Sequence, residues 1–206
     1  MITLFFLACA VPSPPVEAPP PVAPVATEAA PSPAEPPAPA GLPLGASLAV
    51  LDVPLVDHAG QPRAFFVASG ETVIYSMFYT SCPRACPLLI EDIQALAQSL
   101  PEADRAQLRV VLISMDPAND PPEALAGIVT QHHLDATWTL AVPPADRVRE
   151  VAAALGVRYR QLPSGGFAHT SVLTAVDGEG RVLARSDGSV GREALEGAIR
   201  KHVAGS

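Results

Sequence analysis

The chain has 206 residues, a formal charge of −8, and 13 basic residues that are scattered along it without forming a run or stripe. This length allows one ordinary domain with appendages, and the charge pattern argues against a nucleic-acid-binding protein. Only three cysteines are present, so two of them close together point to chemistry rather than to simple packing.

Residues 1–9 form a short apolar segment that ends in Cys9. The segment resembles a bacterial lipoprotein signal, in which Cys9 would be acylated and become the mature N-terminus. It departs from that pattern because no Lys or Arg precedes the apolar run and because Phe6 stands where Leu is usual, so the true start codon can lie upstream. We therefore expect a protein of the bacterial cell envelope, held by lipid on the periplasmic side of a membrane. No run in the sequence is long enough to span a bilayer.

Residues 10–43 consist largely of Pro, Ala, Val, Ser, Thr and Glu, and 12 of the 24 prolines lie between residues 11 and 40. This composition cannot bury a core, and it predicts a disordered, polyproline-like tether. Residues 44–206 then form one domain, whose roughly 160 residues are enough for a substantial core.

The domain begins with two short strands, expected at 47–56 and 63–67 around a turn. The run from 72 to 79 is almost entirely apolar, as in a central strand covered on both faces. It leads into Cys82 and Cys86, which a helical pattern from 88 to 100 follows.

Two cysteines four residues apart at the start of a helix lie on one face of its first turn. Both sulfurs can therefore reach one object, which is either a metal ion or the other sulfur. The unpaired N–H groups and the helix dipole stabilise thiolate over thiol, and Arg84 between the cysteines adds a cation in the same direction. Thiolate is both the nucleophile and the metal-binding form of cysteine.

Strands and helices alternate through the rest of the chain. We expect strands at 108–115, 136–142, 167–176 and 181–186, helices at 121–133, 144–155 and 191–203, and a loop at 157–166. Gly156 is expected to cap the helix that precedes it. This order predicts an α/β protein with a thioredoxin-like three-layer fold, a central mixed sheet and an extra N-terminal hairpin. Ligand sites in such sheets lie beyond the carboxyl ends of the strands, where Cys82 and Cys86 stand.

His169 is the third candidate for the site, because it stands where a glycine-containing loop enters an apolar strand. In oxidoreductases of the thioredoxin type a cis-proline faces the dithiol at the comparable position, and this chain has no proline there. Two thiolates and one imidazole suit Cu(I), and the same set can bind Cu(II) if a further oxygen or nitrogen joins it. Zinc is the competing metal, but its site would be open and no glutamate stands beside the motif to act as a base.

Nearly the whole domain resembles the Sco/SenC family of copper-binding thioredoxin-fold proteins. The matching segments are the CxxxCP motif at 82–87, the S-x-D-P segment at 114–117 with Asp120, the stretch 155–159, and 167–170 with its histidine. The resemblance implies that Cys82, Cys86 and His169 bind copper, and that the protein is a metallochaperone that delivers copper to the binuclear copper A centre of cytochrome c oxidase. Its partners would be the oxidase subunit that carries this centre, or another copper acceptor, and a thiol reductant that keeps the cysteines reduced.

Two residues depart from the pattern of many family members. Arg84 stands where an acidic residue is common, and Ala168 replaces an Asp just before the histidine. The first change should lower the thiol pKa and weaken the attraction for Cu(II), and the second removes an outer-shell partner of His169. Both favour an alternative function as an extracytoplasmic thiol-disulfide oxidoreductase, in which Cys82 attacks and Cys86 resolves. A copper or redox sensor that uses the same cysteine pair is a further alternative.

Overall fold

The computed structural model of the protein describes residues 41–163, 165–188 and 191–203. All of them belong to the second of the two units into which the chain divides, Pro37–Ser206. Cys9, the predicted signal segment and nearly all of the predicted tether lie outside the described residues, so their assignment stays a prediction. Within the described part of the chain, no helix is long and apolar enough to cross a membrane.

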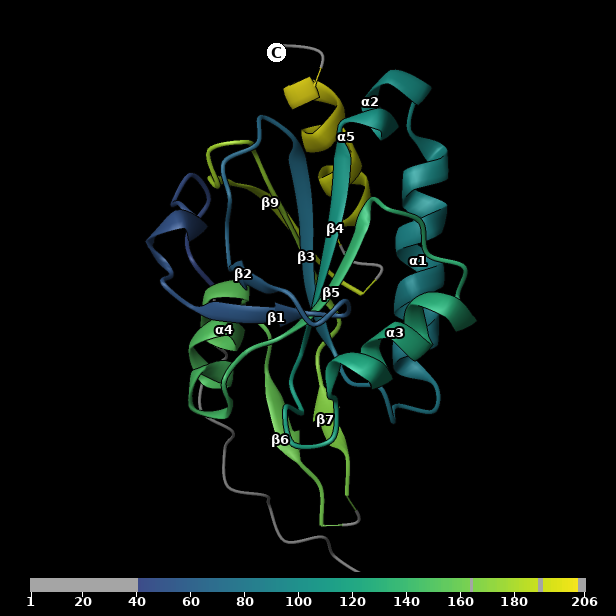
Figure 1. Ribbon diagram of the computed structural model, residues 1–206. Coiled ribbons are helices and arrows are strands. Elements are labelled where there is room, and N and C mark those ends of the chain that lie inside the picture. The colour runs from purple at the N-terminus through teal and green to yellow at the C-terminus, as the bar shows by residue number, and fades with distance from the viewer. Residues whose placement is uncertain (1–40, 164, 189–190, 204–206) are drawn as a thin grey trace, which may run out of the picture. The chain divides into compact units, whose positions relative to one another are not determined.

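A seven-stranded mixed sheet forms the centre of the domain (Figure 1). Its strands, in spatial order, are β2 (Pro62–Ala64), β1 (Pro54–Asp57), β5 (Trp138–Val142), β4 (Leu108–Ser114), β3 (Thr72–Phe78), β8 (Val172–Val176) and β9 (Val182–Asp187). β3 pairs in parallel with β4 and antiparallel with β8. Every residue of β3 is buried, as its apolar sequence predicts. β1 and β2 form the expected N-terminal hairpin at one edge.

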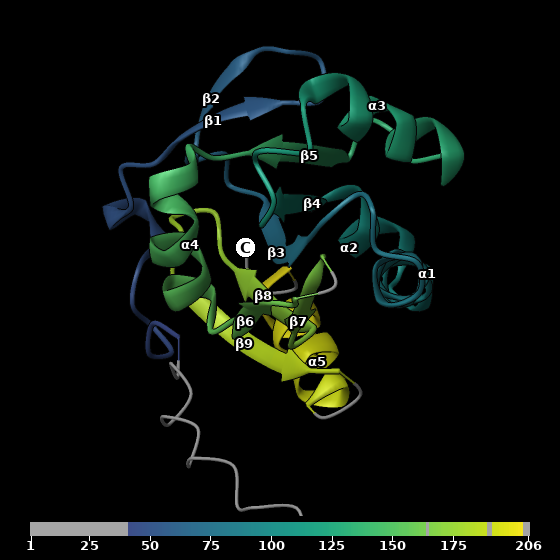
Figure 2. The ribbon, with the colours of Figure 1, turned by 90° about the horizontal axis from the view of Figure 1, so that it is seen from below.

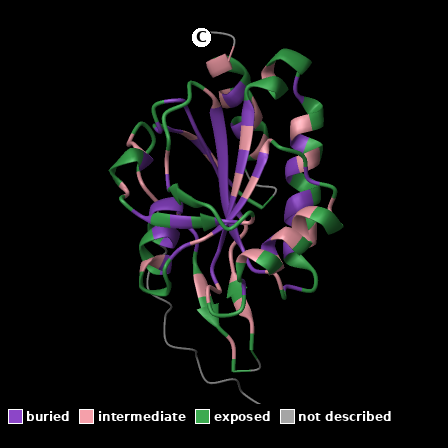
Figure 3. Cartoon of the chain, viewed as in Figure 1, coloured by how far each residue is buried: buried purple, intermediate pink, exposed green. Residues whose placement is uncertain are grey.

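Helices cover both faces of the sheet (Figure 2). One face carries α1 (Ala85–Ser99), α3 (Pro122–Gln131) and α5 (Arg192–Val203), with the short α2 (Glu102–Ala106) after α1. The other face carries α4 (Val148–Leu155), and single 3-10 turns lie at Leu48–Val50 and Ala145–Arg147. Figure 3 shows buried residues concentrated in the strands and on the helix sides that face them. The prediction of a thioredoxin-like three-layer fold is confirmed.

A small second sheet carries the histidine of the predicted site. It consists of β6 (Tyr159–Gln161) and β7 (Phe167–His169), which pair antiparallel and lie at the lower end of Figure 1. The sequence prediction was wrong here, because 157–166 contains a strand and because the single strand expected at 167–176 is divided into β7 and β8. Both strands of the hairpin are short and largely open to solvent, so they lack the alternation of apolar residues that marks a strand.

The remaining differences concern where elements begin and end. α1 begins at Ala85 instead of 88, which places Cys86 inside its first turn. The helix expected at 144–155 starts as a 3-10 turn, and Gly156 caps α4 with a φ of 76°, as predicted. α2 was not predicted, because its five residues are too few to show a helical period.

Candidate metal centre

Three side chains from two distant parts of the sequence meet beyond the carboxyl end of β3. Cys82 lies in the loop after β3, Cys86 lies in the first turn of α1, and His169 ends β7. One ligand atom from each residue, a sulfur or an imidazole nitrogen, lies within 4.8 Å of the other two. The structure thus brings together the three residues that the sequence singled out, and the described residues contain no other such group of His, Cys, Asp or Glu.

The sulfur of Cys82 caps the first turn of α1. The backbone N–H of Cys86 donates a hydrogen bond of 3.3 Å to Cys82 Sγ, and the side chain of Arg84 at the N-cap position makes no capping bond. Both cysteines are free thiols, with only 8% of Cys82 and 4% of Cys86 exposed. The helix terminus therefore directs its positive end at a buried sulfur, which favours the thiolate.

The two thiols differ in acidity. Burial works against ionisation of Cys82, but hydrogen bonds from the Cys86 thiol and from the backbone N–H groups of Cys86 and Arg84 bring its pKa below the ordinary value. Burial raises the pKa of Cys86 well above the ordinary value, and the charges of Cys82 and Asp120 add to this effect. Cys82 is therefore the more acidic of the two thiols, and Cys86 is the thiol that donates to it.

Arg84 lowers the pKa of Cys82 through its backbone and not, as its charge predicted, through its side chain. The hydrogen bond that helps to lower the pKa of Cys82 comes from the Arg84 backbone N–H, a group that every residue except proline has. The Arg84 side chain itself is exposed. The exchange of an acidic residue for arginine at this position thus leaves this contribution unchanged.

The imidazole of His169 keeps one nitrogen available as a ligand. Its Nδ1 lies 3.2 Å from the carbonyl oxygen of Thr170, and because a carbonyl only accepts hydrogen bonds, Nδ1 carries the proton. Nε2 therefore holds a lone pair, and this buried atom has no hydrogen-bond partner among the described residues. The Thr170 carbonyl thus gives the His169 ring an outer-shell partner although residue 168 is an alanine.

Tyr79 is a residue of the site that the sequence analysis did not identify. Its ring packs edge-on against the rings of His169, at 5.8 Å between centroids, and of Phe167, at 5.3 Å. Its hydroxyl donates to the Phe167 carbonyl oxygen at 3.4 Å. Tyr79 thus connects the loop between β3 and α1 (residues 79–84, the cysteine loop) to the β6–β7 hairpin. The signal in the sequence was an aromatic residue at the end of a buried strand, immediately before the motif.

Asp120 is the second residue whose role the sequence did not reveal. It is fully buried, and its carboxylate accepts hydrogen bonds from Thr80, two residues before Cys82, and from Ser114 at the end of β4. The sequence placed Asp120 in a family segment without assigning it a function. Only the fold shows that the segment after β4 reaches the cysteine loop.

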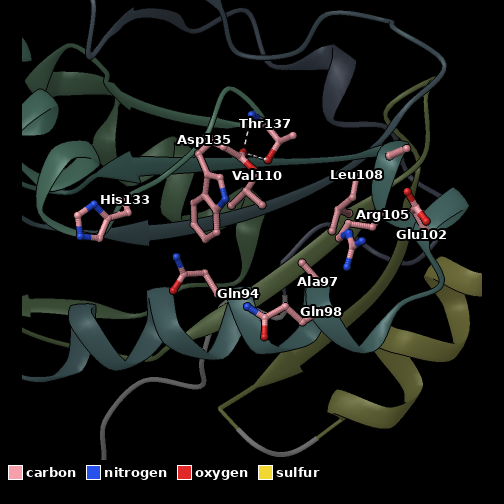
Figure 4. A pocket seen from close by; sticks show the side chains of 12 residues that line it. Gln94, Ala97, Gln98, Glu102, Arg105, Leu108, Val110, His133, Asp135 and Thr137 are labelled. Atoms are coloured by element: carbon pink, nitrogen blue, oxygen red, sulfur yellow. Dashed lines mark hydrogen bonds between the residues drawn. The ribbon is translucent and has the colours of Figure 1, made fainter.

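A cavity of about 410 Å³ lies elsewhere in the domain (Figure 4). Its lining residues come from α1, α2, the loop before β5, and the amino ends of β4 and β5, and include Gln94, Gln98, Asp135 and Thr137. The cysteines lie beyond the carboxyl ends of the same sheet, and none of the three candidate ligands lines the cavity. The cavity is therefore separate from the metal centre.

The fold and the site together define a thioredoxin-like protein with a CxxxC dithiol and a facing histidine. The family model described as SCO1/SenC matches residues 48–204. The chain therefore belongs to the SCO1/SenC family, as its motifs predicted.

Individual proteins resemble the chain over most of its length. A Stutzerimonas stutzeri protein described as a "putative copper-binding protein" is 25% identical over 155 residues, which are 75% of this chain and 69% of that protein. The crystal structure of copper-bound Arabidopsis thaliana ScoI has a TM-score of 0.64 at 16% identity, and covers 80% of this chain and 100% of its own. BsSco, described as a Sco-family cytochrome c oxidase assembly protein with a disulfide switch, has a TM-score of 0.65 at 20% identity, over 80% and 97%. At these identities the two structures show a shared fold.

Proposed function

We propose that the protein is a copper chaperone, which binds one copper ion through Cys82, Cys86 and His169. The donor set carries this proposal: two sulfurs and an imidazole nitrogen lie within 4.8 Å of one another, and the free Nε2 is buried without a partner. Two thiolates and one imidazole suit the soft ion Cu(I). Copper in ScoI, and the description of the Stutzerimonas stutzeri protein, support copper as the cargo.

Each residue of the site has a separate task in this function. Cys82 offers the more acidic thiol, because its pKa is lowered, whereas Cys86 keeps its proton until the metal arrives because burial raises its pKa. The Thr170 carbonyl holds the imidazole of His169 in the tautomer that leaves Nε2 free. Because the cysteines are buried, the sulfurs are protected from bulk oxidants until a partner approaches.

The recipient that we propose is the cytochrome c oxidase subunit that carries the copper A centre. The support is the description of BsSco as an oxidase assembly protein, together with membership of the same family. A lipid anchor at Cys9 and a periplasmic location, both inferred from the sequence pattern, would hold the domain near a membrane-bound oxidase. A thiol reductant would return the cysteine pair to the form that binds copper.

A competition titration tests the copper site. The reduced full chain, in a Cys9→Ser background that leaves Cys82 and Cys86 as its only thiols, is titrated with Cu(I) against a chromophoric chelator. We expect one-to-one binding that weakens by roughly tenfold or more in His169→Ala. His133→Ala removes an exposed histidine outside the site and should leave the affinity unchanged. Binding below one equivalent, or equal affinity for His169→Ala and the parent chain, would reject the proposal.

The unequal acidity of the two thiols favours one alternative, a thiol-disulfide oxidoreductase. In that reaction the Cys82 thiolate attacks a substrate disulfide and forms a mixed disulfide, which Cys86 resolves. The chain gains a disulfide and the substrate gains two thiols, so electrons and protons balance. Insulin reduction that survives His169→Ala and is lost in Cys82→Ser would support this function, and a signalling partner for the same pair would support a sensor.

A further inference from the structure

Asp120 places a buried carboxylate directly beneath the cysteine loop. Its Oδ1 and Oδ2 lie 3.2 and 3.1 Å from the backbone nitrogen of Thr80, and Oδ1 also accepts a hydrogen bond from the Thr80 hydroxyl. The hydroxyl of Ser114, the last residue of β4, donates to the same carboxylate at 2.5 Å. One side chain therefore ties the segment just before Cys82 to the end of the neighbouring strand.

Two other buried aspartates show what a purely structural aspartate does in this fold. Asp57 and Asp177 each begin a hairpin turn and accept two backbone N–H groups of their own turn through Oδ1. Each is also paired with an arginine, Arg63 at 3.6 Å and Arg181 at 2.8 Å. Asp120 has no such cation within the described residues, and its donors belong to the cysteine loop and to β4.

A carboxylate buried without a cation costs free energy that hydrogen bonds only partly offset. The sheet itself does not need this charge, because β3 and β4 are already joined by backbone pairing from Thr72–Leu108 to Phe78–Ser114. The cysteine loop is less well held. Its internal backbone bond runs from the Cys82 N–H to the Tyr79 carbonyl at 3.3 Å, and Ser81, Pro83 and Arg84 are exposed.

We propose that Asp120 is a positioning residue of the metal centre. Its carboxylate accepts hydrogen bonds from both Thr80 and Ser114 and so holds the start of the loop 79–84 at the end of β4. This fixes the position of Cys82 Sγ relative to Cys86 and His169. Asp120 acts through Thr80 and does not itself contact the metal. Without these hydrogen bonds the loop samples several positions, and the three donors converge for only a fraction of the time.

Asp120→Ala and its matched control Asp57→Ala test this proposal, again in the full chain with Cys9→Ser. Both remove a buried aspartate that accepts two or more hydrogen bonds, so both should lower the unfolding midpoint. We expect Asp120→Ala alone to lower the Cu(I) binding constant, by roughly 10- to 100-fold as for other outer-shell partners. If both variants lose stability and both keep the affinity of the parent chain, Asp120 is merely structural and the proposal is overturned.

A second readout does not use copper. The Cys82–Cys86 disulfide is equilibrated with glutathione, so that two glutathione thiols are joined as the protein disulfide is reduced to two thiols. Since formation of this disulfide requires the two sulfurs to approach, we expect its equilibrium constant to shift in Asp120→Ala and to stay unchanged in Asp57→Ala. Equal constants in the parent and in both variants would contradict the positioning role.

The Cu(I) titration of Asp120→Ala rests on the copper-binding function proposed above, whereas the glutathione equilibrium does not depend on copper. If the parent chain binds no copper and Asp120→Ala still shifts the disulfide equilibrium, the chaperone function fails and the positioning role stands. Asp120→Ala also removes the charge that adds to the raised pKa of Cys86, whereas Thr80→Val keeps that charge, the side-chain shape and the backbone N–H. Thr80→Val therefore tests the positioning role separately from the charge, and it also serves if Asp120→Ala does not fold. It should change both constants in the same direction as Asp120→Ala but by less, and unchanged constants in a folded Thr80→Val would count against the positioning role.

Discussion

The backbone N–H of Cys86 donates a hydrogen bond of 3.3 Å to the sulfur of Cys82. One cysteine therefore caps the helix turn that carries the other, and the two cannot be equivalent. The capping sulfur accepts hydrogen bonds that lower its pKa, while the sulfur inside the helix is buried and has a raised pKa. Because the two thiols differ in pKa, they should also differ in how they react with alkylating agents, with protons and with metal.

Alkylation should distinguish the two cysteines. With iodoacetamide, followed residue by residue through peptide mass spectrometry, Cys82 should react first, and its half-maximal rate should fall at a pH below the ordinary cysteine pKa of about 8.5. Cys86→Ala removes the thiol that donates to Cys82, so the Cys82 profile should move to higher pH. Arg84→Ala keeps its backbone N–H and is the control that should leave the profile in place. Equal rates at Cys82 and Cys86 in the parent chain would contradict this account.

The raised pKa of Cys86 should make the reduced protein less stable in alkali. Above about pH 8.5 the unfolded chain loses the Cys86 proton while the folded chain retains it, so folding must take up a proton. The free energy of unfolding should therefore fall with pH, by at most about 1.4 kcal/mol per pH unit, below the region near pH 10 where tyrosines titrate. Urea unfolding at several pH values measures the slope. Cys86→Ala should flatten it, and a slope that persists in this variant must have another origin.

The buried parts of the fold were predictable because their residues follow a simple period. β3 and β4 are mainly apolar along their seven residues, and α1 repeats apolar residues every three or four positions. These patterns predicted all three elements close to their observed places. The β6–β7 hairpin was missed because none of its strand residues is buried, so no burial pattern marks it. Its Phe167 packs against Tyr79, which lies 88 residues earlier in the sequence.

The candidate site, like the fold, was predictable only where local sequence relationships define it. Cys82 and Cys86 could be identified together because four residues along a helix start is a local relationship. His169 was placed by its chemical type and by family resemblance, since no local rule brings it to the cysteines. Asp120 could not be assigned a task, because its carboxylate acts across the gap between two strand ends that only the folded chain brings together.

Alanine substitutions at two neighbouring glycines can distinguish the stability cost of backbone strain from the cost of contact with Tyr79. Gly165 and Gly166 have φ values of +85° and +72°, so alanine at either position should cost about 1 kcal/mol of stability. A methyl group on Gly165 would meet open space, but one on Gly166 would lie 3.2 Å from the Tyr79 hydroxyl. Gly166→Ala should therefore cost more than Gly165→Ala in chemical unfolding. Tyr79→Phe removes the hydroxyl and should bring the two costs together, whereas equal costs with Tyr79 present would mean that the hairpin yields freely.

Copper affinity should depend on pH through Cys86. A thiolate ligand must lose its proton before it binds, and Cys86 remains protonated in the metal-free protein throughout the neutral range because burial raises its pKa. Where Cys82 is already ionised, each Cu(I) displaces one proton, so the logarithm of the binding constant should rise by about one per pH unit. At lower pH, where Cys82 is protonated as well, the slope should approach about two. The measurement is the chelator competition repeated across pH, with Cys86→Ala as the variant that should lose one proton from the slope. An affinity that does not change with pH would mean that Cys86 stays a thiol, and that the metal is held without it.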